Sequence, residues 1–317
     1  MDVILVIMGS ILLIIGFAIL AKCADIFVDG ASNIAYNLKI PAIIVGLTIV
    51  AFGTSAPEAA MSLLNAHSGH VDTALTTIIG SNIFNILMVI GISTFFGILT
   101  IKKDQIKRDF PFLIISTIGL LAIAINIGEL SQQCGIIFLI IIFAYVIYLI
   151  IKAKQERQGT SEKVEAKLTL NKSLLYTIIG LIGIAFGSIL ADHSTHVIAE
   201  QLELSGGIIG LTLVSIGTSL PELITSVNAL RKREKDMVIG NVLGSSIFNI
   251  LFILGITSAF WPITINEKFI PHIVIMTIIT IIGAAFAYTQ NEVNKKEGFV
   301  LVLLYIAYIA YLSVNPI

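Results

Sequence analysis

Two glutamates lie inside apolar stretches of the chain, where a charged side chain is costly. Residues 53–58 read Gly-Thr-Ser-Ala-Pro-Glu, and residues 217–222 read Gly-Thr-Ser-Leu-Pro-Glu. An ionised side chain at the centre of a membrane helix costs about 2.5–3.5 kcal/mol on insertion scales, and it usually marks a functional site. Because Glu58 and Glu222 occupy equivalent places in two similar segments, we expect both to serve one function inside the membrane.

A proline precedes each glutamate and predicts an interruption of the surrounding helix. Pro57 and Pro221 have no amide hydrogen, and a proline ring clashes with the carbonyl four residues before it. We therefore expect free backbone carbonyls over residues 51–54 and 215–218. Free carbonyls in a bilayer must find partners inside the protein or line a wet cavity.

The chemistry of these segments is an all-oxygen ligand set. Carboxylates, hydroxyls and free carbonyls suit hard cations such as calcium, which takes six to eight oxygens. Paired cysteine or histidine ligands, which favour zinc or copper, do not accompany the two segments. Further polar residues recur four apart on neighbouring apolar stretches, so each pair shares a helix face. These residues are Ser81, Asn85, Ser245 and Asn249.

Other interpretations explain parts of this pattern. A proline within a membrane helix is commonly a simple kink, and a serine or asparagine commonly joins two helices. Duplicated halves around a central site also occur in an ion channel. An enzyme is disfavoured, because the sequence contains no HExxH or GxSxG motif and no histidine in the central segments.

Composition places the chain in a membrane. Of its 317 residues, 56% are hydrophobic and only 12% are charged, against about 25% charged residues in soluble domains. The near-neutral charge gives no reason to expect a nucleic-acid partner, and the two cysteines do not suggest a disulfide framework. Spans of about 20 apolar residues are expected at about 2–22, 41–66, 71–96, 108–126, 132–152, 172–192, 206–230, 236–260, 268–288 and 298–314.

The order of these spans predicts an internal inverted repeat. Glu222 follows Glu58 by 164 residues, and the same shift superposes Gly80-Ser81 on Gly244-Ser245. Five spans per half put the second half upside down, so equivalent residues meet near the membrane midplane. We expect an all-α integral membrane protein with ten transmembrane helices in two inverted five-helix repeats, residues 1–152 and 172–317, joined by a cytoplasmic linker over residues 153–171.

Lysine and arginine are concentrated in the loops after odd-numbered spans, whereas Lys268 stands alone on the other side. The positive-inside rule then puts odd-numbered loops in the cytoplasm and both termini outside the cell membrane.

The two central segments resemble the signature repeats of the sodium/calcium exchanger family, within the cation/calcium antiporter superfamily. The resemblance is close over spans 2–3 and 7–8. It implies that Glu58 and Glu222 bind calcium together with the carbonyls of Thr54 and Thr218. It also implies sodium or counter-ion sites, with Asn85 matching the family's amide on span 3. The implied counter-ion ligands are Ala51, Ser55, Glu58, Ser81, Asn85, Ser215, Ser219, Glu222, Ser245 and Asn249.

Asn249 departs from the family pattern, because many sodium-coupled members carry an acid there. Two glutamates balance one calcium ion, two sodium ions or two protons. The sequence therefore predicts a secondary antiporter that exchanges calcium for sodium by alternating access, with proton-coupled or potassium-dependent exchange as the alternative. We expect no cofactor and no obligatory protein partner besides the lipid bilayer.

Overall fold

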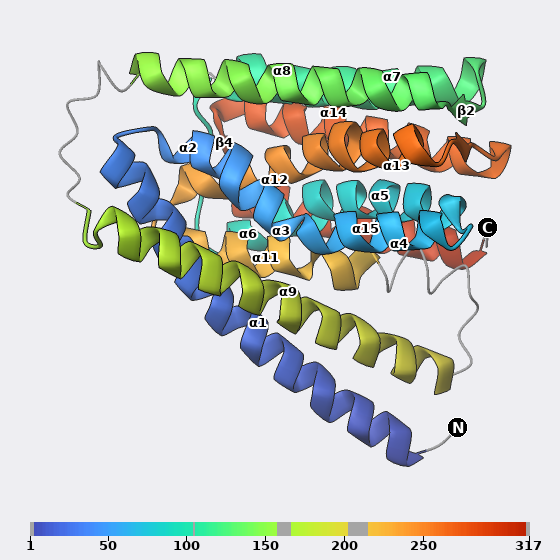
Figure 1. The fold of residues 1–317 in the computed structure, drawn as a ribbon, viewed down its shortest axis with the longest axis horizontal. Helices are drawn as coiled ribbons and strands as arrows, with labels where there is room; N and C mark the ends of the chain where they lie inside the picture. Colours follow the sequence, from blue (N-terminus) through green and yellow to red (C-terminus); the bar gives the residue numbers. More distant parts are fainter. Residues whose placement is uncertain (1–2, 104, 157–165, 202–214, 315–317) are drawn as a thin grey trace.

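The computed structural model describes residues 3–103, 105–156, 166–201 and 215–314. In this part of the chain the fold is a bundle of long helices with four two-residue strands (Figure 1). The elements of the first half are α1 (Val3–Leu38), α2 (Ala42–Val45), η1 (Gly46–Val50), α3 (Ala51–Thr54), α4 (Ala56–His67), α5 (Val71–Phe84), η2 (Asn85–Val89), α6 (Ile90–Phe96), β1 (Leu99–Thr100), η3 (Gln105–Asp109), α7 (Phe110–Asn126), β2 (Glu129–Leu130) and α8 (Gln132–Glu156).

The second half repeats much of this order. Its elements are α9 (Leu170–Gln201), α11 (Ser215–Arg231), α12 (Lys235–Phe248), η5 (Asn249–Ile253), α13 (Leu254–Phe260), β3 (Ile263–Thr264), η6 (Glu267–Phe269), α14 (Ile270–Gln290), β4 (Glu292–Val293) and α15 (Lys295–Val314). The bounds of α5, η2 and α6 become those of α12, η5 and α13 when 164 is added to each residue number.

Eight helices among the described residues are long and apolar enough to cross a membrane. A ninth span results if Ile43–Thr54 and Ala56–His67, which meet at a bend of 43°, are counted together. These nine agree with nine of the ten spans expected from the sequence. Of the remaining one, the seventh, residues 206–214 lie outside the described residues, and the rest belongs to α11.

The first helix is much longer than the sequence predicts. The expected span ends near residue 22, whereas α1 continues to Leu38. Asp25 and Asp29 lie within the helix, and both carboxylates pair with Lys232, the residue that follows α11, at 2.8 and 2.7 Å. Apolar side chains on another face of this segment, including Phe27, are buried in the core.

Helices α1 and α9 pack against each other along much of their lengths, as an inclined pair at one side of the bundle (Figure 1). Glycines make this close approach possible. A Cβ atom at Gly180 would lie 2.6 Å from the backbone nitrogen of Phe27, and one at Gly16 would lie 3.0 Å from that of Ala191. The pair is antiparallel, because Gly30, late in α1, approaches Thr177, early in α9, whereas the earlier Gly16 approaches the later Ala191.

Helices α5 and α12 form the centre of the molecule. The most apolar parts of the spans that contain them, Val71–Phe96 and Lys235–Phe260, are 83% and 94% buried, whereas those of the spans formed by α8, α9 and α15 are less than 30% buried. The short strands pair between the halves, β1 with β4 and β2 with β3, both antiparallel. The centre of the bundle therefore consists of α5 and α12, which carry Ser81 and Ser245, and of η2 and η5, which follow them directly and begin at Asn85 and Asn249.

Candidate cation site

The first glutamate lies just after a bend in the backbone. Helix α3 ends at Thr54, Ser55 leaves the helical region at φ −84° and ψ 3°, and α4 begins with Pro57 in its first turn. The interruption expected at Pro57 is confirmed. The carbonyl of Ala51 is not free, however, because it accepts the Ser55 amide at 3.0 Å and the Ser245 hydroxyl at 3.5 Å.

The second glutamate lies on a helix that does not break. Helix α11 runs from Ser215 to Arg231 with Pro221 inside it. The interruption expected around Ser215 to Thr218 is therefore wrong for the described residues. Because Pro221 has no amide hydrogen, it still removes the helical hydrogen bond to the Gly217 carbonyl. A proline inside a packed span is compatible with a continuous helix when neighbours accommodate it.

The two central helices widen at equivalent places. Five-residue π-helical segments begin at Asn85, directly after α5, and at Asn249, directly after α12. Such widened turns occur frequently at functional sites. Each one starts at the asparagine that the sequence marks as a site residue.

The structure buries the whole predicted ligand set. Glu58 and Glu222 are both fully inaccessible to solvent. The other predicted residues are each no more than 2% exposed, namely Ala51, Thr54, Ser55, Ser81, Asn85, Ser215, Thr218, Ser219, Ser245 and Asn249. Burying two carboxylates away from water is unfavourable unless they are neutralised by a cation or by protons.

Each glutamate accepts a hydrogen bond from a serine of the other half. The Ser55 hydroxyl donates to Oε1 of Glu222 at 3.1 Å, and the Ser219 hydroxyl donates to Oε1 of Glu58 at 3.4 Å. Ser55 and Ser219 each lie three residues before the glutamate of their own segment. The two segments therefore face each other, and their carboxylates belong to one polar cluster.

The threonines and the central helices complete this cluster. The Thr54 hydroxyl lies 3.3 Å from that of Ser245, and the Ser81 hydroxyl lies 3.5 Å from that of Thr218. The two contacts exchange under the 164-residue shift. Ser245 also donates to Oε1 of Glu222 at 3.3 Å. Four helical segments, two from each half, thus supply the polar groups.

The two π-helical asparagines have less direct links to the cluster. Neither amide atom of Asn85 has a hydrogen-bond partner among the described residues. Asn249 donates to Oδ1 of Asn82 at 3.0 Å, and its own Oδ1 has no such partner. The same is true of the Ser215 hydroxyl and of Oε2 of Glu222. Buried oxygens without a protein partner are suitable ligands for a bound cation or water.

Two asparagines at the site, Asn82 and Asn241, are not among the residues predicted from the sequence. Asn241 contacts both Thr54 and Glu222, and Asn82 contacts Ser246 and Asn249. A comparison of the repeats does not reveal them, because the equivalent positions hold Thr77 and Ser246. The sequence feature that could have indicated both residues is a polar amide within an apolar span.

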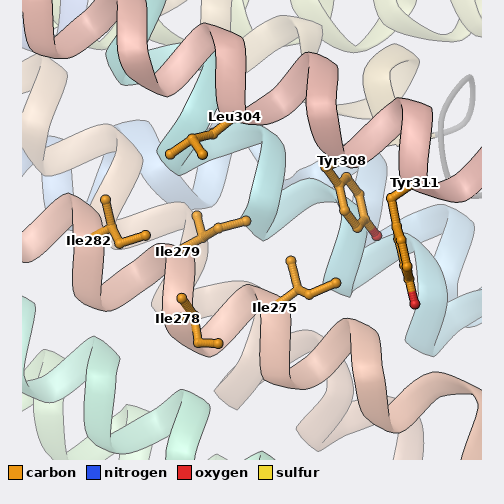
Figure 2. Close-up of a pocket in the computed structure, with 7 residues that line it drawn as sticks. All are labelled: Ile275, Ile278, Ile279, Ile282, Leu304, Tyr308 and Tyr311. Carbon is orange, nitrogen blue, oxygen red and sulfur yellow. The ribbon is translucent and has the colours of Figure 1, made fainter.

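The donor set suits a cation that takes mostly neutral oxygens. Among the described residues, no three histidine, cysteine, aspartate or glutamate side chains lie close enough to hold a metal ion together. A surface cavity between α14 and α15 is lined by apolar side chains and two tyrosines (Figure 2). This cavity includes no residue of the polar cluster and offers few polar groups to a cation. The candidate cation site is therefore the buried polar cluster.

Buried carboxylates and hydroxyls at the centre of a multi-pass helical bundle are typical of ion pathways in membrane proteins. A model of the sodium/calcium exchanger protein family matches residues 8–153 and 172–314. The chain therefore belongs to the sodium/calcium exchanger family, as the resemblance of its motifs indicated. This family consists of transporters rather than enzymes.

Individual relatives agree with this assignment. The chain is 34% identical to a putative antiporter CaxA from Alkalimonas amylolytica, over 95% of this chain and 97% of the relative. It is 28% identical to the sodium/calcium exchanger MaX1 from Methanosarcina acetivorans, over 95% and 97%. The fold matches the sodium-calcium exchanger NCX_Mj, soaked with sodium and strontium, with a TM-score of 0.83, 30% identity and coverage of 96% and 99%.

Proposed function

We propose that this protein is a secondary antiporter that exchanges calcium for sodium at a single buried site. The observation that carries the proposal is the pair of reciprocal hydrogen bonds, Ser55 to Glu222 and Ser219 to Glu58. These bonds bring one acid from each half into the same cluster. Membership of the sodium/calcium exchanger family supports the same reaction.

In this proposal the cation ligands come from both segments. Glu58 and Glu222 bind calcium together with the carbonyls of Thr54 and Thr218. Sodium takes the same carboxylates and neighbouring oxygens. These neighbours are Ser55, Ser81, Ser219, Ser245, the carbonyls of Ala51 and Ser215, and the amides of Asn85 and Asn249. All of them are buried, and the buried oxygens without a protein partner favour this role.

The proposed architecture is ten spans in two inverted repeats, residues 1–152 and 172–317, with a cytoplasmic linker over residues 153–171. Three observations support it. Central helices of the two halves have bounds that differ by 164. The strand pairs β1–β4 and β2–β3 exchange when the halves are exchanged, with a shift of 164 residues from β1 to β3 and of 163 from β2 to β4, as expected for a two-fold axis. The family model also matches the two halves separately.

The proposed orientation places both termini outside the cell membrane and the odd-numbered loops in the cytoplasm. The uneven distribution of lysine and arginine between the two sets of loops supports it. The site then lies near the midplane, where alternating access exposes it to one side at a time.

Charge balance explains why calcium and the counter-ion compete. Two buried carboxylates are neutralised by one calcium ion or by two monovalent cations, and either loaded state crosses the membrane more easily than the empty, doubly charged site. Each cycle therefore carries one cargo or the other. Exchange follows without any contact between the two ions.

Proton-coupled or potassium-dependent exchange is the second candidate. Asn249 favours it, because a neutral amide stands where many sodium-coupled relatives carry an acid. Buried carboxylates also gain protons more readily than exposed ones. The ligand cluster for calcium is the same in both versions.

The proposal is tested by radioactive calcium flux in proteoliposomes, with sodium, potassium and proton gradients imposed one at a time. We expect an outward sodium gradient at clamped pH to drive calcium uptake, with no uptake in empty liposomes. Uptake driven by a pH gradient alone supports the second candidate. Rapid calcium flux without any counter-ion gradient, accompanied by single-channel currents, contradicts an antiporter.

A further inference from the structure

Asn241 lies on α12 and joins the two proposed calcium-binding segments. Its Oδ1 accepts the Thr54 hydroxyl at 3.1 Å, and its Nδ2 donates to the Glu222 backbone carbonyl at 3.2 Å. The same amide nitrogen donates to the Ser226 hydroxyl at 3.0 Å. Asn241 is fully buried. One carboxamide thus spans from the first half to the second.

The equivalent position in the first half does not make this bridge. Adding 164 to the number of Thr77 gives Asn241, and the buried Thr77 hydroxyl has no hydrogen-bond partner among the described residues. A threonine is also shorter than an asparagine and lacks an amide donor. The hydrogen bonds that support the site therefore differ between the two halves, although the proposed ligands are equivalent.

We propose that Asn241 is a positioning residue for calcium binding, which fixes the separation of Thr54 and Glu222. The inference rests on the function proposed above. By accepting the Thr54 hydroxyl hydrogen, Asn241 directs it away from the ligand cluster. By holding the Glu222 carbonyl, it fixes the helix turn from which that carboxylate extends. Asn241 itself is not a ligand in this account.

A positioning role predicts a change in affinity rather than in the rate of the cycle. Loss of hydrogen bonds from buried polar groups lowers binding about tenfold when their position matters for the ligand. We expect Asn241→Leu to raise the KM for calcium uptake about tenfold, with kcat unchanged within about twofold. The calcium Kd of the purified protein, measured by titration calorimetry, should rise by the same factor.

The matched control is Thr77→Val. It removes a buried hydroxyl from the equivalent position without breaking a hydrogen bond to the described residues, so it should leave the KM for calcium unchanged. Thermal unfolding of both variants in detergent separates altered affinity from loss of folded protein. If Asn241→Leu does not fold, Asn241→Thr, which copies the first half, carries the same test.

A double-mutant cycle tests whether Asn241 acts through Thr54. Thr54→Val keeps the backbone carbonyl and removes the hydroxyl. We expect the double variant Thr54→Val with Asn241→Leu to have a KM no higher than the Asn241→Leu variant alone. An unchanged KM in Asn241→Leu, or effects that multiply in the double variant, overturns the inference. Failure of the wild-type protein to take up calcium under any gradient overturns the proposed function instead.

Discussion

Each buried glutamate accepts a hydrogen bond from a serine of the opposite half, so each half of the site depends on the other. Glu58 and Glu222 carry the charge of the cluster, and the hydroxyl groups around them supply neutral oxygens. A site with two negative charges binds a divalent cation strongly when both carboxylates contribute. In the proposed site, removing either carboxylate would leave a bound calcium ion with an uncompensated charge.

Replacement of either glutamate by glutamine tests this dependence. We expect Glu58→Gln and Glu222→Gln each to lower calcium uptake by about a hundredfold or more, because a buried charge loses its partner. Proteoliposome uptake of radioactive calcium measures the effect. The matched control is Glu129→Gln, since Glu129 is exposed and lies in β2, away from the site. Uptake at the wild-type rate in either site variant contradicts the role of that glutamate.

In the proposed site, Asn249 contributes a neutral amide rather than a third acid. Asn249→Asp adds a third acid, and we expect the number of monovalent cations exchanged per calcium ion to rise by about one, because the buried cluster must be neutralised. The reversal potential of calcium flux in proteoliposomes reports this ratio. A reversal potential equal to that of the wild-type protein, with transport retained, shows that position 249 does not contribute charge to the transported states.

At this scale, much of the candidate site is predictable from the sequence. The repetition of a glutamate after Thr-Ser-x-Pro identifies the centre, and the burial of every predicted residue agrees with it. Asn82 and Asn241 could not be found in this way, because their contacts depend on which helices pack together. The hydrogen-bond partners of Asn241 come from positions 19 and 187 residues away.

Among the elements, α1 and α9 form a unit through the close approach of their backbones. We expect Gly180→Ala to destabilise the protein by about 1–3 kcal/mol, because its Cβ would overpack against Phe27. Gly119→Ala is the matched control, since a Cβ there meets nothing within 4 Å. Thermal unfolding in detergent compares the two. Equal melting temperatures for the two variants would contradict a close backbone contact between α1 and α9 at Gly180.

The turn between α11 and α12 makes a second contact with α1, which involves a titratable group. Tyr36 of α1 donates a hydrogen bond to Glu234, which directly precedes α12. Burial raises the pKa of Glu234 above its ordinary value of 4.5, the nearby negative charges of Asp236 and Asp29 raise it further, and the bond from Tyr36 opposes the rise. The folded protein therefore binds this proton more tightly than the unfolded chain does.

The raised pKa of Glu234 makes the stability of the protein depend on pH. Charged Glu234 lowers the free energy of unfolding at neutral pH, and this loss is regained as the pH falls through the raised pKa toward 4.5. We expect Glu234→Gln to be more stable than the wild-type protein at pH 7, with the difference shrinking at acid pH. Melting temperatures across this range provide the measurement. A difference that stays constant or grows on acidification contradicts the assignment.

Element boundaries were less predictable than element positions. Helix α1 continues to Leu38, and Asp25 and Asp29 within it pair with Lys232, which is distant in sequence. Helix α11 also continues through Pro221. Hydropathy and local proline chemistry describe one segment at a time, so neither effect can be read from them.

For the whole molecule, the class of fold was predictable because membrane spans are set by length and hydropathy. The structure and the solved exchanger NCX_Mj agree on a helical membrane fold. The packing of α1 on α9 and the central position of α5 and α12 could not be predicted from the sequence, because they depend on how the spans pack together (Figure 1). The inverted relation of the halves remains a proposal, supported by the exchange of the strand pairs.

The central claim is that one divalent ion is shared by an acid from each half. Crystals grown in low sodium and soaked with strontium, a heavier analogue of calcium, test it directly through anomalous scattering. We predict one strong peak within coordination distance of both Glu58 and Glu222. A peak that contacts only one of these glutamates, or strontium bound elsewhere with the cluster empty, would contradict the account.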